Sequence, residues 1–402
     1  MEYSHEDMIW RGEAVETVQQ VRERALTRQA SESVPIDRLA GRTLTDHIVA
    51  SGDVPAHDHA TMDGYAFDAT NDYPLAVRED EIFPESEPPS IEAGEAVEIA
   101  TGAPLPLEAN AVLKREESEI EDGNLTGVEI DPGMYTYKRG SNMQAGEQLF
   151  HAGERLATKD AILLGDLGYS EVTVFERFST GVLATGTEIH ENRQEDLDSP
   201  MLIDLIRSWG HKASYERTVP DDYDQVKDTI ATLAAEYDVV LTTGGTSVGH
   251  KDFVIRALAD LGELQFHRVR IRPGKPIAVA DLDDAVAFAI PGKPLGAYTI
   301  STLVMRPFFT GRTDLPTREA TLSSDVNLGP EGFEYAVPVT IEGKEAMPLG
   351  HIDSPLQVYE ETFDPSVLSS STRATRADGL VLTQDDLATS EPVDVVPYPV
   401  VE

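Results

Sequence analysis

Residues 237–249 read YDVVLTTGGTSVG, a short apolar run that ends abruptly in small and hydroxyl-bearing residues. Such an apolar run is typical of a strand. Gly244 and Gly245 then allow a tight turn where the strand ends. Apolar strands and helical stretches alternate around this run from residue 178 to residue 310. That alternation predicts an α/β domain with a doubly wound sheet.

The flanking sequence has a different rhythm on each side. Apolar residues recur at helical spacing in 8–30, whereas 46–145 is rich in Gly, Pro and short β-type runs. Residues 149–174 read as strand, helix and strand, with Gly168 at the helix C-cap. After Arg312 the helices stop, and short strands indicate a small C-terminal β-barrel. We therefore expect four domains: an N-terminal linker or dimerisation domain (1–45 with 146–177), an inserted β-rich domain (46–145), the α/β domain (178–312) and the barrel (313–402).

The composition excludes several classes of function. Asp and Glu total 72 against 32 Lys and Arg, a formal net charge of -40 spread along all 402 residues. Such a field repels nucleic acid and anionic membranes, and its even spread favours a protein of a very salty cytoplasm over an ordinary acidic protein. No cysteine is present, so thiolate chemistry and disulfides are excluded. No membrane-length apolar run and no export signal are visible, so we expect a cytoplasmic location.

Polar or small residues follow five of the predicted strands. Each group has a structural alternative: a glycine turn, a helix cap such as Asp at 221 or 222, or a solvated lysine. Ligands of open α/β sheets bind beyond the carboxyl ends of the strands, so five such groups on one edge favour a binding site. The groups are Thr185-Gly186-Thr187-Glu188, Pro220-Asp221-Asp222, Thr243–Gly249 with Asp252, Arg272–Pro276 and Pro291-Gly292-Lys293-Pro294.

The residue types at these strand ends point to phosphoanhydride chemistry. Thr243–Gly249 offers free backbone N–H groups at a helix start, which suits phosphate, although its spacing is not that of a P-loop. Carboxylates are the ligands that Mg²⁺ prefers, and Arg or Lys can hold a second anion. The carboxylates are Glu188, Asp221 and Asp252, and the cations are Arg272 and Lys275.

These stretches resemble the molybdopterin molybdenumtransferase family, which includes MoeA and the E domain of gephyrin. Thr243–Gly249 with Asp252 is similar to the signature of the molybdopterin-binding domain. The order of the other matching stretches is also that of the family, over nearly the whole chain. They are Thr61–Ala66 (TMDGYA), Thr101–Pro106 (TGAPLP), Arg272–Pro276 (RPGKP) and Ala377–Leu380 (ADGL).

The resemblance implies an elongated homodimer that binds adenylylated molybdopterin and molybdate, with Mg²⁺ assisting the release of AMP. A molybdopterin adenylyltransferase is then a candidate docking partner. The site would lie between the α/β domain of one subunit and the N-terminal β-region of the other. The implied catalytic residues are Asp58, Glu188, Asp252, Arg272 and Lys275, the implied metal ligands are Glu188, Asp221 and Asp252, and the implied cofactor-binding residues are Thr101, Asn142, Gly244, Gly245, Thr246, Ser247, Gly249, Pro291 and Lys293.

Three positions depart from the family pattern. Asn142 stands where an acid is usual, and an amide cannot carry its negative charge. Arg272 replaces a lysine and Lys293 an asparagine, so the site stays at least as cationic as that of the family. Three hypotheses therefore stay open: an active molybdenum- or tungsten-transferring enzyme, a non-catalytic molybdopterin-binding scaffold, which Asn142 favours, and the adenylyltransferase itself, against which the flanking β-regions count.

Overall fold

The computed structural model describes residues 8–245, 253–360 and 362–402 and divides the chain into two compact units. The first unit comprises Met1–Glu32, Ala40–Thr43 and Thr173–Glu402, and the second comprises Ser33–Leu39 and Leu44–Val172. Two short strands, β1 (Ser31–Pro35) and β12 (Glu171–Phe175), pair with each other where the chain passes from one unit to the other. The predicted division into four domains stays a prediction.

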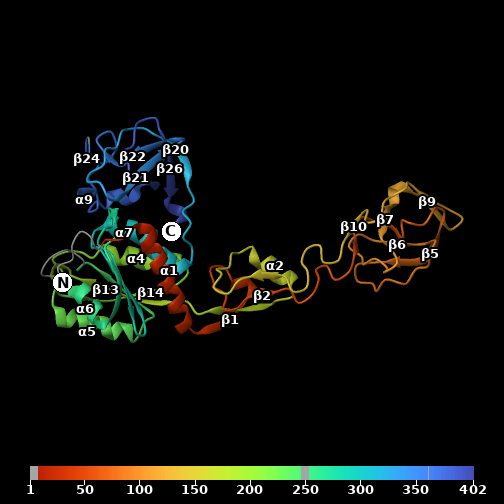
Figure 1. Ribbon diagram of the computed structural model, residues 1–402, viewed down its shortest axis with the longest axis horizontal. Helices are drawn as coiled ribbons and strands as arrows, with labels where there is room; N and C mark the ends of the chain where they lie inside the picture. Colours follow the sequence, from red (N-terminus) through yellow and green to blue (C-terminus); the bar gives the residue numbers. More distant parts are fainter. Residues whose placement is uncertain (1–7, 246–252, 361) are drawn as a thin grey trace. The chain divides into compact units, whose positions relative to one another are not determined.

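The first unit contains the doubly wound sheet that the sequence predicts (Figure 1). Its order is β14-β13-β15-β19-β18-β16, with the first four strands parallel and the last two antiparallel to their neighbours. The central strand β15 is buried along its whole length. The strands are β13 (Ser179–Thr185), β14 (Lys212–Val219), β15 (Val239–Thr243), β16 (Gly262–His267), β18 (Ala278–Leu282) and β19 (Val286–Ile290).

Helices cover both faces of this sheet. Alternate strand residues point to opposite faces: Leu183 and Val240 pack with α5 (Tyr223–Ala234) and α6 (Phe253–Leu261). Val182 belongs to the core of the other face. That face is covered by α1 (Arg11–Arg28), α4 (Asp198–Ser208), α7 (Pro294–Ile300), the π-helical η4 (Ser301–Met305) and α8 (Arg306–Thr310), while α3 (Thr187–His190) follows β13.

The C-terminal part forms the predicted barrel. Pairing of β21 with both β22 and β25 closes five strands into a ring. The expectation that helices stop after Arg312 is wrong for one short helix, α9 (Pro365–Leu368), which Asp364 caps. The ring comprises β20 (Arg318–Leu322), β21 (Glu334–Glu342), β22 (Glu345–Pro348), β25 (Gly379–Thr383) and β26 (Pro392–Pro397), and β23 (Gly350–His351) pairs with β24 (Gln357–Tyr359) outside it.

Residues 263–271 (ELQFHRVRI) read as a single strand in the sequence, but the structure divides them. The chain turns at Arg268, whose φ of 77° is left-handed, and this ends β16. The following β17 (Ile271–Arg272) pairs with β21 of the barrel instead. A strand that the sequence analysis missed, β18, then forms a hairpin with β19.

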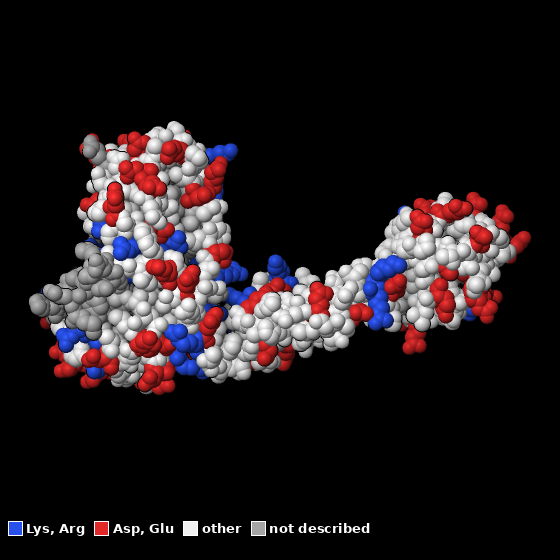
Figure 2. Space-filling view, in the orientation of Figure 1, with Lys and Arg blue, Asp and Glu red and all other residues white. Residues whose placement is uncertain are grey.

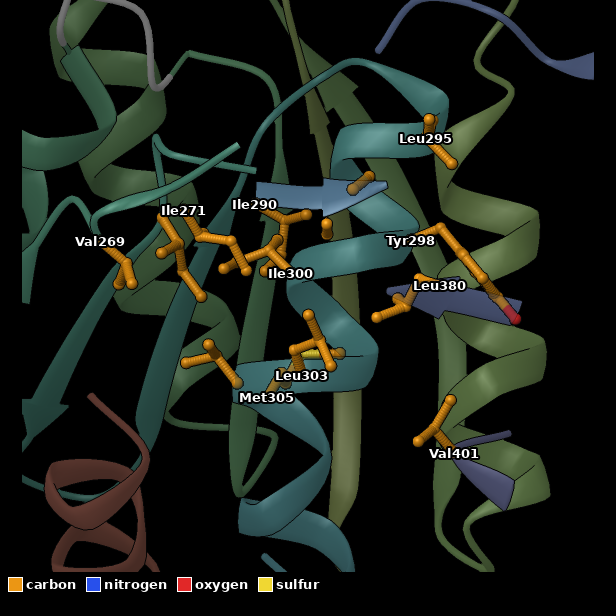
Figure 3. Packing of buried hydrophobic residues seen from close by; sticks show 14 of the residues in the cluster. Val269, Ile271, Ile290, Leu295, Tyr298, Ile300, Leu303, Met305, Leu380 and Val401 are labelled. Atoms are coloured by element: carbon orange, nitrogen blue, oxygen red, sulfur yellow. The ribbon is translucent and has the colours of Figure 1, made fainter. Parts of the chain in front are cut away.

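One apolar core joins the sheet to the barrel. Figure 3 shows Ile290 of β19, Ile300 of α7 and Leu303 of η4 gathered in it, together with Leu380 of β25. Each of these side chains is at most 2% exposed. Because this core is continuous, the loops at the end of the sheet stand on a well-packed base.

The second unit is built on a curled sheet with the order β7-β4-β6-β5-β9-β8. Strands β3 (His59–Ala60) and β10 (Thr136–Tyr137) pair beside it, and β2 (Ile48–Val49) pairs with β11 (Gln148–Phe150). Helix α2 (Asp160–Asp166) and Gly168 after it match the expected strand, helix and strand. The sheet strands are β4 (Gly64–Phe67), β5 (Leu75–Ile82), β6 (Glu95–Ile99), β7 (Ala111–Lys114), β8 (Ser118–Glu121) and β9 (Asn124–Gly127).

The surface carries the acidic excess of the sequence. Figure 2 shows acidic side chains scattered over the visible face of each unit, with basic ones in smaller groups. In the ranges that the structure describes, no helix is long and apolar enough to cross a membrane.

Candidate functional site

A pocket of about 340 Å³ lies beyond the carboxyl ends of β13, β14, β15 and β19. Four of the five predicted groups contribute to its wall, which supports the expectation that they share one edge of the sheet. The residues from these groups are Thr185, Gly186, Glu188, Asp221, Thr243, Gly244, Gly245, Gly292, Lys293 and Pro294. The segment after α9 adds Ser370 and Thr372.

Glycines let the strand ends approach one another closely. Gly244 has a φ of 81°, and a Cβ there would lie 2.7 Å from the carbonyl oxygen of Thr185. A Cβ on Gly292 would lie 3.2 Å from the Cα of Gly244. The Thr185 hydroxyl donates to the Thr243 carbonyl at 2.8 Å, which ties β13 to β15. These turns therefore expose backbone where a larger residue would fill the space.

Two of the predicted metal ligands line this pocket. Glu188 lies on α3 and is half-buried, and Asp221 follows β14. Thr187 holds Asp221 in place, because its Oγ1 lies 3.0 Å from the Asp221 backbone nitrogen and 3.4 Å from Oδ2. The neighbouring Asp222 instead accepts from the Gln225 backbone N–H at 2.9 Å and caps α5. The capping alternative thus holds for Asp222, whereas Asp221 lines the pocket.

Lys293 carries the one positive charge among the described residues of the pocket wall. It is exposed at the start of α7, and its Nζ donates to the carbonyl oxygen of Ser366 at 3.3 Å. Pro291 is buried directly after β19 and is not part of the wall. The pocket is therefore strongly acidic, so an anionic ligand would need a cation beside it.

Arg272 and Lys275 lie apart from this pocket wall. Arg272 stands on β17, with its guanidinium carbon 4.2 Å from the ring centroid of Phe333, and the Lys275 Nζ is 5.9 Å from the same centroid. Burial lowers the pKa of Lys275, and the charges of Arg272 and Arg268 lower it further. Neither Arg272 nor Lys275 is in a salt bridge with any residue that the structure describes. This cationic group suits an anion, as its residue types predict.

The second unit holds the other three predicted residues. Asp58 Oδ1 accepts from the backbone N–H of Arg139 at 2.7 Å. Asp63, in the TMDGYA stretch, accepts from both the backbone N–H and the hydroxyl of Thr101, each at 2.7 Å. Asn142 donates from Nδ2 to Asp166 Oδ2 at 2.9 Å. Each of the three therefore has a local hydrogen-bond partner in its own unit.

Thr246, Ser247, Gly249 and Asp252 lie outside the described residues. Across the remainder of the chain, no three His, Asp or Glu side chains are gathered as a ready-made metal site. Glu188 and Asp221 nevertheless present hard oxygen donors to one pocket, and this donor set fits Mg²⁺.

Three acids in the same wall were not among the predicted site residues: Glu195, Asp196 and Asp198. Asp198 is 7% exposed, and burial together with the charge of Asp196 raises its pKa to about 6. The sequence signal at this point is an acid before an apolar helical run, which normally indicates a solvated cap. Asp196 does act as such a cap, since its Oδ1 accepts from the backbone N–H of Ser199 at 3.0 Å.

Comparison with known proteins identifies the family. The family described as "MoeA N-terminal region (domain I and II)" matches residues 13–168, and "Probable molybdopterin binding domain" matches residues 181–311. The molybdopterin molybdenumtransferase of Synechococcus elongatus is 30% identical over 306 residues, covering 70% of this chain and 74% of that protein. That of Haemophilus influenzae is 29% identical over 295 residues, covering 69% and 72%.

A solved structure agrees over a longer stretch. The crystal structure of the MoeA molybdopterin biosynthesis protein of Pyrococcus horikoshii has a TM-score of 0.72 and 29% identity, and it covers 97% of this chain and 99% of that one. The chain therefore belongs to the molybdopterin molybdenumtransferase (MoeA) family.

Proposed function

We propose that this protein inserts molybdate or tungstate into adenylylated molybdopterin with release of AMP, in the biosynthesis of molybdenum cofactor. The observation that carries this proposal is the pocket itself. Glu188, Asp221, the Gly244-Gly245 turn and Lys293 converge on it from four strand ends. Exposed backbone at glycine turns suits phosphate oxygens, and the carboxylates suit a divalent ion that neutralises them.

In this proposal the two acids and the cation have separate tasks. Glu188 and Asp221, with Asp252, would hold Mg²⁺, and the chemistry that the ion supplies when bound is stabilisation of charge on the departing phosphate. Lys293 would hold the same end of the substrate by its charge. Arg272 and Lys275 lie near the ring of Phe333 and have no salt bridge to a described residue, and they would hold the molybdate or tungstate ion.

We further infer a homodimer in which Asp58, Thr101 and Asn142 of one subunit complete the site of the other. The family membership supports this arrangement, as does the placement of these three residues in a different unit from the pocket. The acidic surface favours work in a very salty cytoplasm, where counter-ions screen the repulsion. An adenylyltransferase that delivers the substrate is the expected docking partner.

The test is release of AMP by the purified protein. Adenylylated molybdopterin, Mg²⁺ and molybdate are combined at high salt, and AMP is followed over time. Release that depends on molybdate or tungstate is the expected result. Formation of adenylylated molybdopterin from ATP would instead assign the adenylyltransferase step.

The second candidate is a scaffold that binds the adenylylated pterin without turnover. One observation favours it: Asn142, which stands in place of the usual acid, is engaged with Asp166. Tight binding of the substrate with no AMP release over hours would support the scaffold.

A further inference from the structure

Asp198 is a buried carboxylate in the pocket wall that the proposed mechanism does not use. It begins α4 and is 7% exposed, and it lines the pocket beside Gly292. Its Oδ1 is sealed from solvent and has no hydrogen-bond partner among the described residues. The helix start does not need it as a cap, because Asp196 accepts from the backbone N–H of Ser199.

A carboxylate in this position is costly for the free protein. An ionised group buried without a partner loses its hydration and gains nothing in return. No described salt bridge reaches Asp198, and Lys293, the cation of the wall, donates to Ser366. The nearby Asp196 carries the same sign of charge, and its Oδ2 also lacks a partner. A bound ligand that brings hydrogen-bond donors would offset this cost.

The chemistry of the wall selects among ligand groups. A phosphate or other anion would be repelled by Asp196 and Asp198 together. A divalent ion needs more ligands than these two acids supply, and no described group of three acids or histidines is gathered here. An uncharged N–H donor can instead bond to the other oxygen, Oδ2, without bringing negative charge into the pocket. Gly292 lies next to Asp198, because a Cβ built on it would be 4.0 Å from Oδ2. Since glycine has no side chain, the space beside this oxygen is left to a ligand.

We propose that Oδ2 of Asp198, the oxygen that lies beside Gly292, accepts a hydrogen bond from the 2-amino group of the pterin ring and so selects a 2-amino-4-oxopyrimidine edge. This inference rests on the proposed function, which makes a pterin the substrate. A pocket of about 340 Å³ is within the size range of small-molecule sites and suits one bicyclic ring.

The test compares two uncharged ring systems that differ at one group. The protein is titrated at neutral pH and high salt with 6-hydroxymethylpterin and with 6-hydroxymethyllumazine, which has a carbonyl in place of the 2-amino group. A site that pairs a buried acceptor with a donor rejects the analogue that lacks the donor, so we expect at least about tenfold preference for the pterin. Asp198→Asn and Asp198→Ala should each reduce that preference to about threefold or less.

The matched control is Asp204→Asn. Asp204 lies on the same helix, with a side chain that is 83% exposed, so the variant makes the same chemical change away from the pocket. It should keep the full preference of the wild type. Thermal unfolding of each variant confirms that it is folded.

Two outcomes would overturn the inference: a wild type that does not distinguish the two rings, or Asp198 variants that retain the preference. Neither outcome touches the proposed function, because molybdate-dependent AMP release is measured separately. Conversely, a wild type that prefers the pterin but releases no AMP would keep Asp198 as the pterin-binding residue and would favour the scaffold.

Discussion

Asp221 and Thr187 hold each other across the ends of β14 and β13. Thr187 Oγ1 lies 3.0 Å from the Asp221 backbone nitrogen, and the Asp221 carboxylate lies 3.4 Å from the same hydroxyl. The adjacent Asp222 instead caps α5 through Gln225. Asp221 thus lines the pocket, whereas its neighbour Asp222 caps a helix.

Because only Asp221 lines the pocket, the same substitution should reduce activity at position 221 and leave it nearly unchanged at position 222. Asp221→Asn removes a charge from the pocket and should lower AMP release by at least about a hundredfold, as loss of a group that stabilises a charged transition state does. Asp222→Asn is the control, because Asn caps helices as well as Asp does, and its activity should stay within about twofold. Equal losses in both variants, or none in Asp221→Asn, would remove Asp221 from the mechanism.

Gly244 should tolerate no side chain. Gly244→Ala places a methyl group 2.7 Å from the Thr185 carbonyl oxygen at a φ of 81°, so strand ends that form the pocket must separate. We expect a loss of about 2–4 kcal/mol in unfolding free energy and a loss of substrate binding. The control is Gly168→Ala, at a φ of 85° with nothing within 4 Å, which should cost only about 1 kcal/mol. Denaturant unfolding of both variants measures the difference, and equal costs would contradict a steric role for Gly244.

Asp198 should make the free protein less stable than its asparagine variant. Its pKa is raised from the usual 3.8 to about 6, so the unfolded chain ionises more readily than the folded one. The resulting penalty is fully present above about pH 6 and disappears as pH falls toward 3.8. Asp198→Asn should therefore gain up to about 3 kcal/mol at pH 7. That gain should shrink between pH 6 and pH 4 in urea unfolding, whereas Asp204→Asn should show no such trend. A destabilised Asp198→Asn at pH 7 would disprove the penalty.

Part of the fold and of the candidate site could be predicted from the sequence, and part could not. The sheet, the barrel and the gathering of four strand ends follow from local signals: apolar periodicity, strand length and glycine turns. The burial of Asp198 could not be predicted, because it depends on packing between α4 and a turn almost a hundred residues away. Residues 263–271 read as one strand in the sequence, and only the barrel decides that β17 separates from β16 and pairs with β21.

Asn142 stands where the family usually has an acid, and its side chain donates a hydrogen bond to Asp166. A test of position 142 must therefore take Asp166 into account. Asn142→Asp alone sets two carboxylates side by side where an amide now donates at 2.9 Å, so repulsion should lower stability by about 1 kcal/mol. The double variant Asn142→Asp with Asp166→Asn restores a donor and an acceptor. For an active enzyme we expect AMP release by the double variant within about threefold of the wild type. A rise of more than about tenfold would instead mark the natural protein as a weakened relative.

Mixing of subunits tests whether one site is shared between two chains. Asp221→Asn disables the pocket in the first unit, and Thr101→Ala removes the hydroxyl that Asp63 holds in the second unit. If the site combines units of different subunits, a mixed dimer has one site with both defects and one intact site. Equal mixing of the two inactive proteins, after denaturation and refolding together, should then restore about a quarter of the wild-type AMP release. If each site lies within one chain, every subunit in the mixture is defective and no activity returns, which would refute the shared site.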